Sequence, residues 1–238
     1  MRVRGYDDIF LCSSNELIIK YFNKLAISDY ESCTLISPSN RLCAETNKLV
    51  RKTLFKQIEN LNLNDLILVT QNNLPTGLVN GDLVRVIEIG GFEYRCGMKF
   101  RVIEIETLVK KVKKKTTIIE DVLNGHQTNI DNKQHKDLMI DFAIRMRDKG
   151  VLQESLGFDE AMKKDKYLNA LKAVYGYALT CHKSQGGEWD EVFMLFNKSV
   201  YSLVFKNGAQ SLHQFWYTAI TRAKTKLHIG YNEEWMVE

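Results

Sequence analysis

Thr180–Asp190 reads Thr-Cys-His-Lys-Ser-Gln-Gly-Gly-Glu-Trp-Asp and lies between two apolar runs, 173–179 and 192–196. Both runs are short and apolar, which is typical of buried parallel strands. The sequence therefore predicts a polar turn at the carboxyl end of the first strand, where open α/β sheets bind ligands. Two glycines in the turn, Gly186 and Gly187, would let the backbone approach a ligand closely.

The side chains of this turn suit a nucleotide or a nucleic acid. Glu188 could accept a hydrogen bond from a ribose hydroxyl, and Thr180, His182 and Lys183 offer donors to phosphate oxygens. Taken singly, His182 fits a hydrogen-bonded structural histidine and the glycine pair fits a tight turn. Those two explanations do not account for so many polar groups within one short stretch.

A second polar cluster, 217–224, reads Tyr-Thr-Ala-Ile-Thr-Arg-Ala-Lys. A helix is predicted over 212–223, because apolar residues recur there at helical spacing. These residues are Leu212, Phe215, Trp216, Ala219, Ile220 and Ala223. The spacing leaves Arg222 on the opposite side of the helix, away from the core. A guanidinium there could hold phosphate oxygens bidentately, or it could form a surface salt bridge.

The amino-terminal residues also have an α/β pattern. Apolar spacing predicts a helix over 16–25, and the apolar run 33–36 predicts a buried strand. Ser37 followed by Pro38 predicts an N-cap with proline at the first helical position. A strand followed by a helix is the opening of an α/β unit.

The middle of the chain changes to a β pattern. Strands are predicted in four short segments, separated by Gly-, Asn- and Pro-containing turns. The segments are 66–70, 83–89, 100–105 and 116–119. A polar stretch, 124–134, predicts a loop, and helices are predicted over 136–149 and 160–171. Several short strands in succession favour a small barrel.

These patterns together predict one α/β domain with a β-rich insertion. The domain would comprise residues 1–62 and 170–238, and the insertion, a small barrel plus a helical segment, residues 63–169. The α/β domain would have a parallel sheet with helices on both faces.

Composition allows a nucleic-acid partner. The 238 residues carry a net charge of +4, and seven basic residues lie between Lys99 and Lys115. That segment could contact phosphates, or it could be a strand edge protected by lysines. Five cysteines without a Cys-x-x-Cys pair predict neither a zinc site nor a disulfide framework, and favour a reducing, cytoplasmic location. No apolar run is long enough to span a membrane.

The two polar clusters resemble motifs V and VI of superfamily 1 helicases of the RecD-like branch. Residues 180–190 look like motif V and residues 217–224 look like motif VI, in the expected order. Ser37–Asn47 is similar to the helix after the first strand of the family's second motor domain. Gln71–Asn73 with Asn80–Asp82 resembles the entry to its inserted SH3-like barrel. The resemblance thus covers most of the chain, apart from 125–171.

This resemblance implies the C-terminal half of a DNA helicase, with a RecA-like second motor domain. Arg222 would be the arginine finger on ATP, Gly187 and Glu188 would border the nucleotide, and Gln185 would couple the nucleotide and DNA sites. Single-stranded DNA would be contacted by five residues. These are Thr180, His182, Lys183, Asn40 and Gln71. Gly187 departs from the serine frequent in relatives, which removes a hydroxyl and keeps the backbone donor. DNA repair or recombination would be its setting.

The motifs that hold the phosphates and the magnesium ion of ATP are missing. The chain has no Gly-x-x-x-x-Gly-Lys-Ser/Thr and no acidic pair after an apolar strand. In the family, ATP and Mg²⁺ are held largely by an N-terminal motor domain. We therefore expect no ATP hydrolysis by these residues alone. That domain would be supplied in cis or by a partner subunit, and a non-catalytic single-strand-binding module is the alternative.

Overall fold

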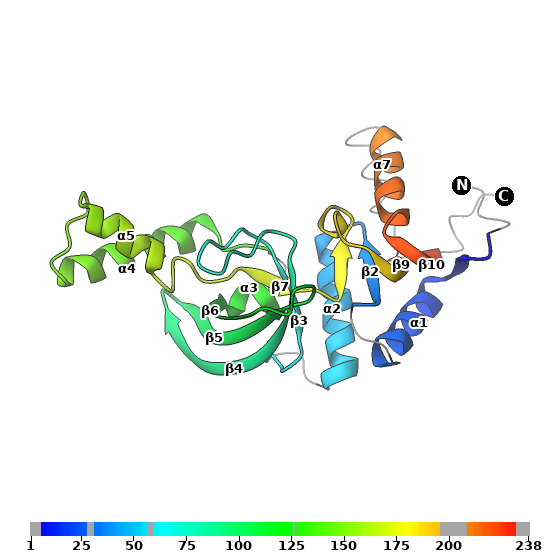
Figure 1. The fold of residues 1–238 in the computed structure, drawn as a ribbon, viewed down its shortest axis with the longest axis horizontal. Coiled ribbons are helices and arrows are strands. Elements are labelled where there is room, and N and C mark those ends of the chain that lie inside the picture. The colour runs from blue at the N-terminus through cyan, green and yellow to red at the C-terminus, as the bar shows by residue number, and fades with distance from the viewer. Residues whose placement is uncertain (1–5, 28–30, 57–59, 126, 196–208, 232–238) are drawn as a thin grey trace. The chain divides into compact units, whose positions relative to one another are not determined.

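The computed structural model describes residues 6–27, 31–56, 60–125, 127–195 and 209–231. The chain divides into two compact units (Figure 1). Unit 1 comprises Met1–Ile58 and Gly176–Glu238, and unit 2 comprises Glu59–Tyr175. Unit 2 is therefore inserted into the sequence of unit 1.

Unit 1 is built on a five-stranded sheet with the order β1-β10-β9-β2-β8, in which all neighbours are parallel. Its strands are β1 (Ile9–Ser13), β2 (Cys33–Ser37), β8 (Ala178–Thr180), β9 (Trp189–Leu195) and β10 (Ala223–Tyr231). Every residue of β2 is buried, as expected for a strand covered on both faces.

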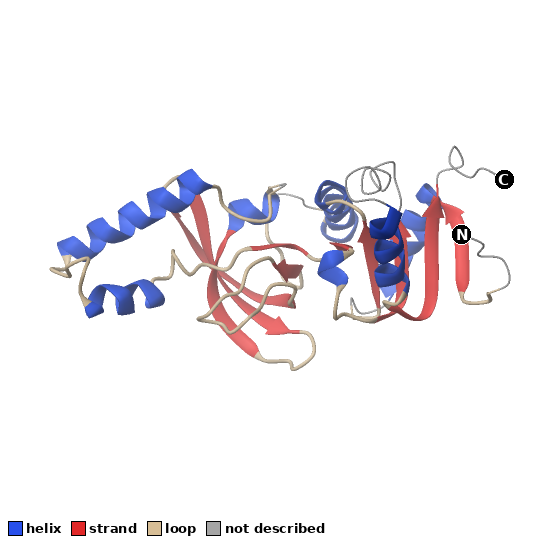
Figure 2. Cartoon of the chain, turned by 90° about the horizontal axis from the view of Figure 1, so that it is seen from above, coloured by secondary structure: helices blue, strands red, loops and turns tan. Residues whose placement is uncertain are grey.

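Helices lie on both faces of this sheet, and Figure 2 shows its strands among them. They are α1 (Ser14–Ile27), α2 (Asn40–Phe55) and α7 (Ala209–Ile220). Right-handed crossovers place α1 and α2 over one face. Between β9 and β10 the chain crosses the sheet in the opposite direction, so α7 lies over the other face. α1 packs so closely that a Cβ on Gly230 would lie 2.9 Å from Leu17.

Unit 2 contains an antiparallel sheet with the order β6-β5-β4-β3-β7. Its strands are β3 (Leu66–Val69), β4 (Leu83–Arg95), β5 (Met98–Thr107), β6 (Lys113–Ile119) and β7 (Ala173–Tyr175). The pairing of β4 with β5 shifts register twice, between Val86 and Glu88 and between Ile89 and Phe92. Such bulges bend a strand and increase its twist, which curls the sheet.

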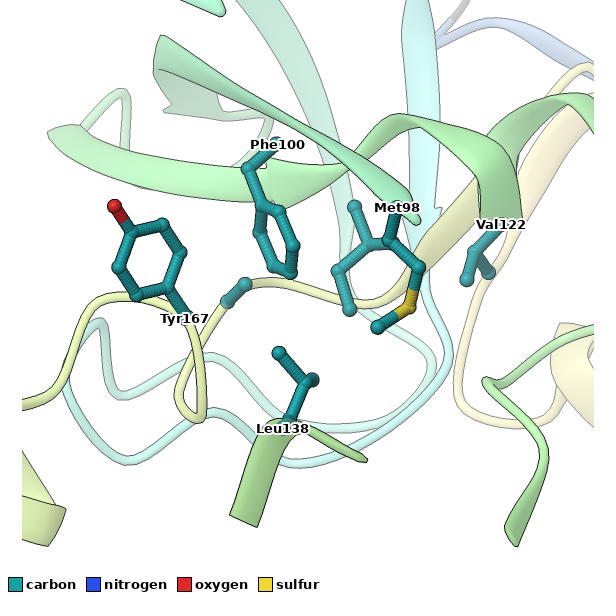
Figure 3. Close-up of a cluster of buried hydrophobic side chains, with 7 residues drawn as sticks. Met98, Phe100, Val122, Leu138 and Tyr167 are labelled. Atoms are coloured by element: carbon teal, nitrogen blue, oxygen red, sulfur yellow. The ribbon is translucent and has the colours of Figure 1, made fainter. Parts of the chain in front are cut away.

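Three helices complete unit 2: α3 (Glu120–Asn124), α4 (Asn132–Asp148) and α5 (Leu156–Lys164). Leu138 of α4 packs with Met98 and Phe100 of β5 and with Tyr167, which follows α5 (Figure 3). A capping box between Asp131 and Gln134 starts α4. The predicted class, a parallel α/β unit interrupted by a β-rich insertion, is confirmed.

The predicted strand over 173–179 is wrong, because the structure has two strands there. Ala173–Tyr175 pairs antiparallel with β3 of unit 2, whereas Ala178–Thr180 pairs parallel with β2 of unit 1. Gly176 and Tyr177 separate them. Both strands are largely buried, so the apolar pattern of the sequence runs through the boundary without a break.

Other elements also differ from the prediction. Ser37 ends β2, and Ser39 caps α2 instead, its Oγ accepting from the Leu42 amide at 3.2 Å. The helix predicted over 160–171 lies at Leu156–Lys164, because Ser155 caps its start. Strand β1 was not predicted, although Ile9–Cys12 is a short continuous apolar run. Phe196, at the end of the predicted strand 192–196, lies outside the described residues.

Candidate functional site

The polar loop 181–188 crosses the unit 1 sheet from the carboxyl ends of its strands to their amino ends. Thr180 is in register with Ser37 at the carboxyl end of β2, whereas Glu191 is in register with Cys33 at its amino end. The loop runs along α7, and the Cys181 thiol donates to the Phe215 carbonyl at 3.4 Å. A short 3-10 helix, η1 (His182–Ser184), forms its first half.

This path corrects the expectation that the whole polar cluster lies at the carboxyl ends of the strands. Thr180 and His182 follow the carboxyl end of β8, and the His182 side chain is exposed. Gly187 and Glu188 precede the amino end of β9. The loop must span the sheet because β8 and β9 both run parallel to β2. The cluster is therefore two sites joined by one loop.

Arg222 lies at the second of these sites. A helix was predicted over 212–223, but α7 ends at Ile220, so Arg222 follows the helix rather than lying on it. Its Nε donates to the Thr218 carbonyl at 3.0 Å and its Nη1 to the Gly187 carbonyl at 3.1 Å. Its Nη2 donates to the Thr221 hydroxyl at 3.0 Å. The guanidinium therefore satisfies the end of α7 and holds the glycine loop, and its remaining N–H groups could bind an external ligand.

The backbone fixes the same contact. The Trp189 amide donates to the Arg222 carbonyl at 2.9 Å, where β9 and β10 begin to pair. Glu188 beside it is exposed, with Lys224 at 3.9 Å as an equally exposed neighbour. An exposed pair at that distance contributes little to stability. Glu188 is thus available to a ligand next to Arg222.

Gly187 has a specific packing role. A Cβ on Gly187 would lie 2.3 Å from Cη2 of Trp189, whose indole is buried. A serine here would therefore need the indole to move. The indole explains why this chain has glycine where a hydroxyl residue is frequent in the resembling family.

Replacing Gly187 with serine is expected to destabilise unit 1 by about 1–3 kcal/mol, as overpacking of a buried site usually does. The melting temperature should fall by roughly 2–4 °C for each kcal/mol, measured by scanning calorimetry. Gly91→Ala is the matched control, because nothing lies within 4 Å of a Cβ there. An unchanged melting temperature for the Gly187 variant would contradict a tight contact with Trp189.

The first site combines Lys183 with the amino end of α2. Burial lowers the pKa of the Lys183 ammonium, and the nearby Cys43 thiol opposes this shift. Burial also raises the pKa of Cys43 to about 12, so this thiol stays neutral. The first turn of α2, which begins with exposed Asn40, carries no acidic residue. The helix end and Lys183 thus present uncompensated positive charge.

Gln185 and Gln71 have different settings. Gln185 ends η1, its amide donating to the His182 carbonyl at 3.4 Å, and its side chain is exposed. Gln71 belongs to unit 2, where its side chain accepts from Lys172 Nζ at 2.8 Å. Burial lowers the pKa of Lys172. Sequence reasoning assigned no role to Lys172, which lies between a predicted helix and a predicted strand, or to Trp189, which lies within the polar turn 180–190.

The basic segment 99–115 has partners within unit 2. Glu120 Oε2 accepts from Lys99 Nζ at 3.1 Å and from Arg101 Nε at 2.9 Å. Lys114 Nζ donates to the Thr76 carbonyl. Lys113 and Lys115 lie on β6, the edge strand of the sheet, where lysines oppose pairing with another chain. Most of this segment therefore fits the strand-edge interpretation.

Within the described ranges, no group of three or more His, Cys, Asp or Glu side chains is arranged to hold a metal ion. In the same part of the chain, no helix has the length and apolarity needed to cross a bilayer.

The fold and the two sites can now be compared with known proteins. Residues 175–229 match the family model of the UvrD-like helicase C-terminal domain. The matched segment runs from the end of β7 to β10 and includes both polar clusters. The helicase resemblance inferred from those clusters is thereby confirmed.

One curated protein and several solved structures are also similar to this chain, each over part of its own length. The uncharacterized protein MJ1519 of Methanocaldococcus jannaschii is 35% identical over 72 residues, which are 30% of this chain and 6% of that protein. A Pif1 helicase from Bacteroides, solved with ADP-AlF3 and ssDNA, is 14% identical with a TM-score of 0.46. The match covers 95% of this chain and 48% of that helicase. For the Pif1 helicase from Candida albicans the identity is 17%, the TM-score 0.34 and the coverages 98% of this chain and 48% of that one. The chain thus spans about half the length of these helicases.

Proposed function

We propose that this chain is the C-terminal motor half of an ATP-dependent DNA helicase of the RecD-like branch of superfamily 1. Residues 1–62 and 170–238 would be the second motor domain, and residues 63–169 an inserted SH3-like barrel with a helical segment. One observation carries the proposal: Arg222 is bonded to Gly187 beside the exposed Glu188. The family match over both polar clusters supports it.

The Arg222 site forms one wall of a nucleotide cleft in this proposal. ATP would supply the free energy of the motor when bound, and the helicase resemblance implies that its Mg²⁺ would be held largely by the other half. Arg222 directs its remaining donors at the terminal phosphate, where an always-charged planar group stabilises negative charge. Gly187 would border the nucleotide, and Glu188 would accept from a ribose hydroxyl.

The Lys183 site binds the strand. A phosphate there would compensate the half-buried ammonium of Lys183 and the positive end of the α2 helix dipole. Thr180, His182 and Asn40 also lie at the carboxyl ends of the strands and add donors. Gln71 would make a separate contact with the strand on unit 2. Gln185 lies between the two sites on loop 181–188, which is the basis for assigning it the coupling role.

A loss of strand affinity is expected when Lys183 is replaced with alanine. Each phosphate contact of a single strand contributes about −0.7 to the slope of log affinity against log salt. The variant should bind an oligonucleotide several-fold more weakly, with a slope smaller by about that amount, measured by fluorescence anisotropy from low to high salt. Lys52→Ala, at the exposed far end of α2, is the control and should leave the slope unchanged. Equal slopes for both variants would contradict a phosphate contact at Lys183.

The second candidate is a single-strand-binding subunit that has no catalytic role or is completed by a partner. It is favoured by the absence of a Gly-x-x-x-x-Gly-Lys-Ser/Thr motif from the 238 residues. A phosphate-release assay separates the two. We expect no DNA-stimulated turnover by these residues alone, and turnover when a half carrying that motif is joined to them. Failure of the joined protein to hydrolyse ATP would favour the second candidate.

A further inference from the structure

The end of the β4–β5 hairpin has one covered face and one open face. On the covered face, Met98 and Phe100 are buried against α4 and Tyr167. Glu93 accepts from the Tyr167 hydroxyl at 2.7 Å, and Arg95 donates to Asp141 of α4 at 2.7 Å. The helical segment therefore covers this face and rigidly supports the hairpin.

Two aromatic side chains lie on the open face. Phe92 is 53% exposed and Tyr94 is 69% exposed. Their ring centroids are 5.8 Å apart in an edge-to-face arrangement. Phe92 is in register with Arg101 and Tyr94 with Lys99, so each ring stands opposite a cation on β5.

The two cations lie close to the Phe92 ring. Lys99 Nζ is 4.7 Å and the Arg101 guanidinium carbon 5.0 Å from its centroid. Glu120, which is buried, binds both cations and neutralises one of the two charges. The Asp121 carboxylate also accepts from the Lys99 amide at 2.6 Å, so two cations and two carboxylates lie close to the exposed rings.

We propose that Phe92 and Tyr94 form a base-stacking site for single-stranded nucleic acid on the insertion. Every base offers a π-face to an aromatic ring, and such stacking is tolerant of sequence. Lys99 and Arg101 lie beside the Phe92 ring and offer donors to the phosphates that accompany the bases. This site rests on the proposed strand binding, adds base contacts to it, and differs chemically from the phosphate contacts at Thr180 and Lys183.

Two oligonucleotides of equal length and charge test this site, one of thymidines and one of abasic residues. The full chain should bind the thymidine strand about tenfold more tightly, since stacking contributes roughly that factor per base. The double variant Phe92→Ala/Tyr94→Ala should bind both strands equally, at the abasic affinity. Tyr94→Phe should retain the preference, because the ring remains.

The matched control is Ile140→Ala/Ile144→Ala, which removes exposed apolar side chains from α4 of the same unit. It should keep the thymidine preference, and circular dichroism should show equal melting for all variants. If the double variant keeps the preference, or if its affinity for both oligonucleotides falls equally, the proposed stacking site is wrong, whereas the proposed binding of single strands stands. If the unaltered chain binds neither strand, the proposed function itself fails.

Discussion

Replacing Arg222 with alanine is expected to lower ATP turnover of a complete motor by about a thousandfold or more. An arginine that stabilises the transferred phosphoryl group contributes roughly that factor, up to about a hundred thousandfold. The expectation applies to this chain joined to a half that carries the phosphate-binding motif. The measurement is DNA-stimulated phosphate release at saturating ATP.

The variant must also be tested for folding, because Arg222 holds the Gly187 carbonyl and the end of α7. Arg222→Lys is the informative companion, since it keeps the charge and loses the planar fork that reaches Gly187 and a phosphate together. Binding of single-stranded DNA should be nearly unchanged in both variants, because the proposed DNA site at Lys183 lies at the opposite end of the β-strands from Arg222. Survival of turnover in the alanine variant would rule out the finger.

A large loss of stability is expected for Phe142→Ala in unit 2. Phe142 of α4 is fully buried and packs edge-to-face on Phe158 of α5 at a centroid distance of 5.0 Å. Removing a buried phenylalanine typically costs about 3–5 kcal/mol, because a cavity remains. Urea unfolding followed by circular dichroism measures the change, with the two units expected to unfold as separable transitions.

Ile144→Ala on the same helix is the control, because its side chain is 45% exposed. It should change the free energy of unfolding by less than about 0.5 kcal/mol. The transition assigned to unit 1 should not move in either variant, since both residues belong to unit 2. A shift of under about 1 kcal/mol for Phe142→Ala would mean that α4 and α5 do not share a packed core.

Much of the fold could be predicted from apolar spacing. Helices α1, α2 and α4 each bury a stripe, as Leu17, Tyr21 and Leu25 do in α1, and such stripes are visible in sequence. Strand β2 is buried throughout because it lies inside a parallel sheet, and its mostly apolar sequence makes it recognisable. The run 173–179 was predicted as one strand because burial alone does not tell which sheet a strand joins.

The residues of the two sites could be predicted from the sequence, but their positions in the fold could not. The pattern of 180–190 indicates a ligand turn, but only the register of β8 and β9 with β2 separates Thr180 from Gly187. Helical spacing placed Arg222 on a free helix face. It did not anticipate that Thr221 and Arg222 end the helix by bonding its last carbonyls. These outcomes depend on contacts between segments far apart in sequence.

The discontinuity of unit 1 has a consequence for folding during synthesis. Strand β2 is made early, yet both of its neighbours, β8 and β9, are made only after the whole of unit 2. Unit 2 is continuous and can fold as soon as it is made, which brings the residues that flank it close together. The loop that β2 and β8 must then close is effectively much shorter, and its entropic cost is lower. The insertion thereby prepares the pairing of the central sheet.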